Sequence, residues 1–79
     1  MARVTATAGE WTTVPDTGGA MLLEARFHGV YVDTSGTPPV DPKEGYALSD
    51  GTSWVISAGV VVNVWPMRSV DAELFAHLA

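Results

Sequence analysis

The sequence predicts a small all-β domain, an antiparallel β-sandwich or barrel of about seven short strands followed by a short C-terminal helix. Three observations predict this fold class. Short segments rich in Val, Thr, Tyr and Trp recur along the chain. Turn residues separate these segments at intervals of roughly six to twelve residues. The apolar residues of the last segment have helical spacing instead. The 79 residues are enough for one domain, with a β core at 3–66 and a tail at 67–79.

The first half of the chain contains four predicted strands. Residues 3–7 and 11–14 are rich in Thr and Val, which favour strands, and a Pro- and Gly-containing loop follows them. Residues 20–27 are good helix formers, but their apolar side chains alternate with Glu24 and Arg26, which is the two-residue period of a strand. Val30–Asp33 is the fourth predicted strand, after a His-Gly turn.

The second half contains a long loop and three more strands. Residues 34–45 hold three prolines and two glycines and are predicted to be a loop. The predicted strands are Tyr46–Leu48, Ser53–Ile56 and residues 60–65, with Gly-containing turns between them. Both faces of the strand at 60–65 are largely apolar. We therefore expect it to be covered on one side by the core and on the other by another element or another subunit.

The tail is predicted to form a helix that starts near Ser69. Ser69 can act as the N-cap, and acidic residues follow in the first turn, where the helix dipole favours negative charge. Apolar side chains then recur on one side at helical spacing: Val70, Leu74, Phe75 and Leu78. A helix this short is not stable alone in water, so it must dock on its own domain or on a neighbouring subunit or surface.

Composition predicts a protein that associates with others. The apolar share is 47% and the charged share only 16%, and there is no cysteine to form disulfides. A chain this short then gains stability most readily by oligomerisation. The net charge of −5 argues against nucleic-acid binding, no apolar run reaches the roughly 20 residues of a membrane span, and the absence of thiols fits a reducing cytoplasm.

Residue patterns for catalysis or metal binding are weak. Asp16-Thr17-Gly18 matches the tripeptide of aspartic proteases, but the preceding proline and the short chain favour a simple turn. The acidic residues around the long loop lack the dense oxygen spacing of a calcium loop, and two isolated histidines do not make a zinc site. We therefore predict no catalytic residue, no cofactor and no metal.

Large aromatic side chains lie on the predicted strands. In a small β domain such residues usually belong to the core or to a subunit interface, because they bury a large area. The alternative is that exposed rings stack on sugars and bind host glycans. The candidates for this glycan-stacking role are Trp11, Trp54 and Tyr31.

The order of elements resembles that of small virion proteins of tailed bacteriophages. The resemblance covers about residues 3–66 and rests on an early Glu10-Trp11, the Val30–Asp33 strand, the Thr37-Pro38-Pro39 loop, and the segment from Trp54 to Gly59. It implies an all-β virion protein. Many such proteins coat the head as decoration or cement proteins, often as homotrimers, and others belong to the tail or its fibres.

The resemblance implies a function and partners. We expect a head decoration protein on the capsid surface of a virion, made in the host cytoplasm, whose partners are the major capsid protein and further copies of this chain. Burial of apolar surface against the coat would stabilise the assembled shell. The residues expected to make these contacts are Trp65, Met67, Arg68, Leu74, Phe75 and Leu78. The alternative is a tail- or fibre-associated adhesion domain that binds host glycans.

Overall fold

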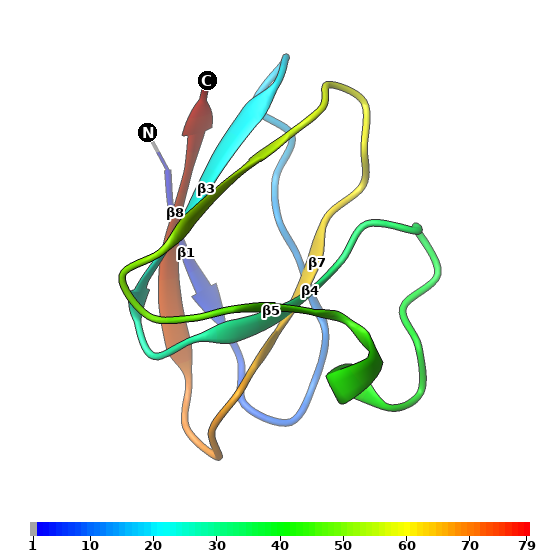
Figure 1. Cartoon of the computed structure of the whole chain (residues 1–79), viewed down its shortest axis with the longest axis vertical. Coiled ribbons are helices and arrows are strands. Elements are labelled where there is room, and N and C mark those ends of the chain that lie inside the picture. Colours follow the sequence, from blue (N-terminus) through cyan, green and yellow to red (C-terminus); the bar gives the residue numbers. More distant parts are fainter. Residues whose placement is uncertain (1) are drawn as a thin grey trace.

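The computed structural model describes residues 2–79, which form eight strands and one short 3-10 helix (Figure 1). Each of the predicted strands overlaps an observed one, so the all-β class is confirmed. The strands are β1 (Ala2–Ala6), β2 (Thr12–Thr13), β3 (Met21–Phe27), β4 (Val30–Asp33), β5 (Tyr46–Leu48), β6 (Ser53–Ile56), β7 (Asn63–Pro66) and β8 (Ala72–Leu78), and the 3-10 helix is η1 (Pro42–Glu44).

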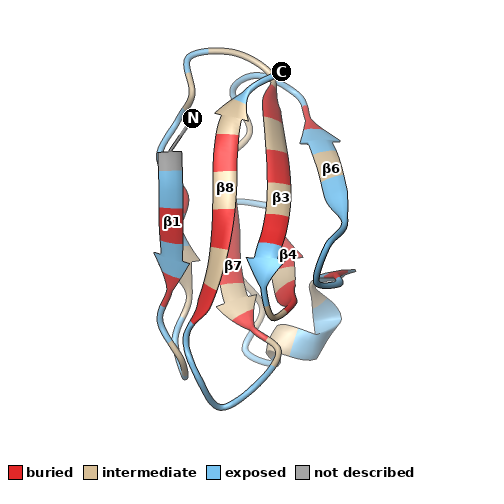
Figure 2. Ribbon diagram, turned by 90° about the vertical axis from the view of Figure 1, so that its left-hand side faces the viewer, coloured by how far each residue is buried: buried red, intermediate tan, exposed pale blue. Residues whose placement is uncertain are grey.

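The strands form two antiparallel four-stranded sheets that pack against each other. Sheet A has the order β1-β8-β3-β6, and sheet B has the order β2-β7-β4-β5. Figure 2 shows sheet A in front, with β7 and β4 of sheet B behind it. Within residues 2–79 neither sheet closes on itself. Of the two predicted architectures, sandwich and barrel, the structure therefore has a sandwich-like arrangement and not a barrel.

The predicted C-terminal helix is wrong, because Ala72–Leu78 forms strand β8. This strand lies between β1 and β3 and is hydrogen-bonded to both. Ala72, Leu74 and Ala76 are buried, and the residues between them are partly exposed. In so short a segment this two-residue alternation coexists with helical spacing. The strand is favoured because it pairs the backbone groups of β1 and β3, which a helix would leave without partners.

The hydrophobic core lies between the two sheets. In β3 the side chains of Met21, Leu23 and Ala25 point inward and are buried, as the alternation predicted. Leu23 of β3 and Leu74 of β8 have no exposed surface. The buried apolar residues are Val4, Ala6, Val14, Met21, Leu23, Ala25, Val30, Val32, Leu48, Ile56, Val62, Val64, Ala72, Leu74 and Ala76.

Strand β7 is covered by the core on one side and only partly covered on the other. It is shorter than predicted and lies between β2 and β4. Val64 faces the core and is fully buried, whereas Trp65 points to the outer side of sheet B and is half-buried. Trp11, which precedes β2, packs against Trp65. The second apolar face of the predicted strand at 60–65 is therefore covered in part by another element of the domain, and Val61 on that face remains 53% exposed.

Candidate binding pocket

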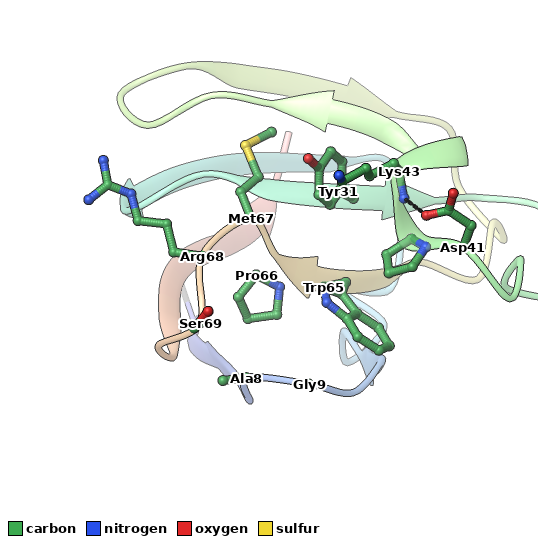
Figure 3. A pocket seen from close by; sticks show the side chains of 11 residues that line it. Ala8, Gly9, Tyr31, Asp41, Lys43, Trp65, Pro66, Met67, Arg68 and Ser69 are labelled. Atoms are coloured by element: carbon green, nitrogen blue, oxygen red, sulfur yellow. Dashed lines mark hydrogen bonds between the residues drawn. The ribbon is translucent and has the colours of Figure 1, made fainter.

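An open pocket of about 450 Å³ lies on the outer side of sheet B (Figure 3). Residues from β4, β7, η1 and the loop after β1 surround it. Its volume is within the range of roughly 300–1,000 Å³ that is usual for ligand sites. The lining residues that matter here are Tyr31, Asp41, Lys43, Trp65, Met67 and Arg68.

Two aromatic side chains form the floor of the pocket. Tyr31 of β4 and Trp65 of β7 are directly paired across the two strands. Their neighbours Val30, Val32 and Val64 point into the core, and because successive side chains alternate, the two rings must point outward together. Both rings remain partly exposed and can be contacted by a ligand.

The Trp65 ring is held in place by Trp11. The two indole rings meet edge to face, with centroids 5.6 Å apart and planes at 71°. Trp11 is itself fixed, since its Nε1 donates a hydrogen bond to the Pro39 carbonyl oxygen at 3.2 Å. The long loop at 34–45 thus supports the aromatic floor through this bond, and the floor is preorganised before any ligand arrives.

Helix η1 places a cation beside the floor. Asp41 is its N-cap, and Asp41 Oδ1 accepts a hydrogen bond from the Lys43 backbone N–H at 3.0 Å. Pro42 follows at the first helical position, where its fixed φ suits the helix. Figure 3 shows the exposed Lys43 side chain extending from η1 toward Tyr31.

The chain's four cations fall into two groups. On the outer side of sheet A, Arg3 Nε lies 2.7 Å from a carboxylate oxygen of Glu73, and Arg26 Nε lies 3.6 Å from one of Glu24. The other two cations, Lys43 and Arg68, both line the pocket. Within residues 2–79 neither of them has a carboxylate oxygen within 4 Å. The two cationic side chains that have no carboxylate partner among residues 2–79, Lys43 and Arg68, therefore both lie at the pocket.

The six predicted contact residues do not form one surface. Trp65, Met67 and Arg68 line the pocket. Leu74 is fully buried in the core and cannot reach a partner, which is a direct consequence of the strand that replaces the expected helix. Phe75 lies on the outer side of sheet A, with the Arg26 guanidinium 5.2 Å from its ring centroid.

Leu78 lies at the end of β8 in sheet A and is 63% exposed. It does not line the pocket, which is on the outer side of sheet B.

The predicted glycan-stacking residues also lie in different places. Tyr31 lines the pocket and Trp11 supports its floor. Trp54 lies in β6 and stacks on Tyr46 instead, with ring centroids 4.6 Å apart. Two of these three aromatics therefore belong to the pocket region.

Lys43 and Asp41 line the pocket, although no pattern in the sequence predicted them as site residues. A local signal for their conformation was present, because an Asp followed by Pro is typical of the start of a helix. The contact of η1 with β4 had no comparable signal. Gly45 packs against the backbone of Val32, where an added Cβ would lie 3.0 Å from the carbonyl oxygen. Close packing of this kind depends on the folded chain and is invisible in the spacing of residues.

The other acidic residues behave as turn and loop residues. Asp16 Oδ1 accepts a hydrogen bond from the Gly18 N–H at 3.0 Å, so the protease-like tripeptide forms a local turn. Asp33 is buried, and its Oδ1 accepts from the Ser35 hydroxyl at 2.8 Å. Its Oδ2 has no hydrogen-bond partner among residues 2–79. In the same part of the chain no group of three or more His, Asp or Glu side chains is placed to hold a metal ion.

No helix formed by the described residues has the length and apolar character needed to cross a membrane. Comparisons with protein-family models, with curated proteins and with solved structures find no match to this chain.

Proposed function

We propose that this chain is a virion structural protein, a decoration protein that reinforces a phage head by binding coat subunits. The resemblance in the order of its elements supports this function. The structural observation that carries it is an exposed apolar side of the sandwich, where the edge strands of the two sheets, β5 and β6, lie together. We name this surface the β5–β6 side and define it by Tyr46 and Trp54.

The β5–β6 side has the properties of a docking surface. Tyr46 is 65% exposed and stacks on the partly buried Trp54 with ring planes at 21°. Val55, the next residue of β6, points to the opposite side, which is the outer side of sheet A. Each edge strand also presents backbone groups with no partner in its own sheet. A strand of coat protein or of a second copy can pair with such an edge while its side chains contact the aromatic stack.

Binding of this kind stabilises an assembled shell. A ligand that binds only the assembled state shifts the equilibrium toward it. In a homotrimer, three copies of the β5–β6 side would engage symmetry-related coat subunits at once, which raises the overall affinity without any new type of contact. The partners in this proposal are the major capsid protein and further copies of the chain.

The test uses shells assembled from the major capsid protein of the same phage. The wild-type chain is expected to cosediment with the shells and to raise their temperature of disassembly. Tyr46→Lys is expected to reduce binding about tenfold or more, because it places an unpaired charge in an apolar contact. Val61→Lys is the matched control, since Val61 is 53% exposed in the loop before β7 and belongs to neither β5 nor β6.

Two results would contradict the decoration function. One is a shell whose thermal stability is the same with and without the protein. The other is equal loss of binding for the Tyr46 and Val61 variants, which would place the contact elsewhere on the molecule.

A second candidate function is a tail- or fibre-associated adhesion domain that binds host glycans. The observation that favours it is the partly exposed Tyr31–Trp65 floor, since flat aromatic rings on a rigid sheet are suited to stacking on sugar rings. Calorimetric titration of the chain with neutral and charged oligosaccharides tests it. Absence of heat with every sugar would rule it out, and loss of binding in Tyr31→Ala would support it.

A further inference from the structure

The pocket combines an aromatic floor with both cations that have no carboxylate partner among the described residues. From this we infer that its ligand is an acidic oligosaccharide, a glycan whose sugar rings carry carboxylates. The inference rests on the glycan-binding candidate function and adds the charge class of the ligand. It does not depend on the β5–β6 side, whose residues Tyr46 and Trp54 do not line the pocket.

The floor suits the apolar face of a pyranose ring. Tyr31 and Trp65 are adjacent across β4 and β7 and both line the pocket, so one ligand can contact both side chains. The edge-to-face contact with Trp11 keeps the Trp65 ring from rotating. Stacking on a fixed ring costs little side-chain entropy, which favours binding of a shallow ligand.

The cations suit carboxylates on the sugar. Figure 3 shows Lys43 and Arg68 on opposite sides of the labelled floor residues, with Lys43 directed toward Tyr31 and Arg68 extending outward. A ligand longer than one sugar can place one carboxylate near each cation. Charge-assisted hydrogen bonds of this type are the stronger ones. A small anion such as phosphate could contact one cation but would leave the aromatic floor uncovered.

The net negative charge of the protein does not prevent an acidic ligand from binding at the pocket. The chain carries a net charge of −5, but at physiological ionic strength charges beyond about 8 Å are largely screened. Of the charged side chains that line the pocket, two are cations, Lys43 and Arg68, and one is an anion, Asp41. Asp41 lies beside Lys43, and the carboxylate oxygen that does not accept from the Lys43 backbone can accept a hydrogen bond from a sugar hydroxyl.

The experiment compares two forms of one oligosaccharide by calorimetric titration of the full chain. The probes are a hexamer of galacturonic acid and the same hexamer with every carboxylate methyl-esterified, which keeps the rings and removes the charge. The acid is expected to bind about tenfold or more tightly than the ester, the effect of at least one charge-assisted hydrogen bond. Its affinity is also expected to fall as salt is raised.

Variants locate the contact. Lys43→Gln is expected to weaken binding of the acid about tenfold while leaving binding of the ester unchanged. Lys43 is exposed on η1, so this change removes the charge without disturbing the core. Arg3→Gln is the control, because it removes one positive charge from the outer side of sheet A and should leave both affinities unchanged.

The possible failures are distinguishable. Equal binding of acid and ester would overturn the assignment of an acidic ligand and leave the glycan-binding function standing. Binding of neither probe would overturn the acidic ligand, and it would overturn the glycan function as well if neutral sugars also fail. Inorganic phosphate that competes fully with the acid at equal concentration would show that the cations bind any anion and would also overturn the assignment.

Discussion

Trp11 and Trp65 meet edge to face with their ring centroids 5.6 Å apart, although they come from distant parts of the chain. This contact covers the outer side of β7 and joins it to the long loop, because the Trp11 indole N–H donates to the Pro39 carbonyl oxygen. An aromatic pair of this geometry contributes about 0.5–1.5 kcal/mol beyond the area that it buries. The pair therefore supports both the fold and the candidate pocket.

Trp11→Phe is expected to lower the free energy of unfolding by about 1 kcal/mol, since it removes the indole N–H and keeps an aromatic ring. Trp11→Ala removes the ring as well and is expected to lower it by about 2–3 kcal/mol. Urea unfolding followed by circular dichroism measures both. Equal losses for the two variants would show that the ring contact contributes nothing to stability.

Leu74→Ala is expected to lower the free energy of unfolding by about 2–5 kcal/mol, because it leaves a cavity where the side chain has no exposed surface. Leu78→Ala is the matched control in the same strand. Leu78 is 63% exposed, so the expected loss is below about 0.5 kcal/mol. Losses of similar size at both positions would contradict the exposure of Leu78 at the end of β8.

Gly29→Ala is expected to lower the free energy of unfolding by about 1–3 kcal/mol through overpacking. An added Cβ would lie 2.9 Å from the Leu48 carbonyl oxygen and 2.7 Å from the Met67 sulfur, and the backbone oxygen cannot move aside. Gly19→Ala is the control. There the Cβ would meet only the tip of the Leu78 side chain at 2.8 Å, which can rotate into solvent. Thermal unfolding of both variants should separate them by several degrees, and equal melting temperatures would argue against the tight packing at Gly29.

Asp33→Asn is expected to raise the free energy of unfolding at neutral pH by about 1 kcal/mol, because it removes a buried charge while keeping an oxygen for the Ser35 hydroxyl. The present carboxylate has one oxygen without a partner among residues 2–79. Asp50→Asn, in the exposed turn before β6, is expected to change stability very little. A destabilised Asp33 variant would mean that the charge itself is needed, for example to hold a cation.

The pocket could be predicted only in pieces. The sequence predicts Trp65, Met67 and Arg68 as contact residues and Tyr31 as a glycan-stacking residue, but no pattern in it places Tyr31 beside the other three. Their grouping depends on the pairing of β4 with β7, which brings Tyr31 beside Trp65 although the two residues are far apart in the chain. No pattern in the sequence marks Lys43 as a pocket residue, because its place beside the pocket depends on the capped turn of η1 and on the packing of Gly45 against β4.

Local sequence signals predict the all-β class, the approximate place of each strand from β1 to β7, and the long loop at 34–45 within which η1 forms. These signals are the alternation of apolar residues and the Gly and Pro residues of turns. The conformation of Ala72–Leu78 depends instead on tertiary contacts, because the spacing of its residues fits helix and strand alike. It became a strand because β1 and β3 supply hydrogen-bond partners along both of its edges and a core for Leu74, and such partners are distant in sequence.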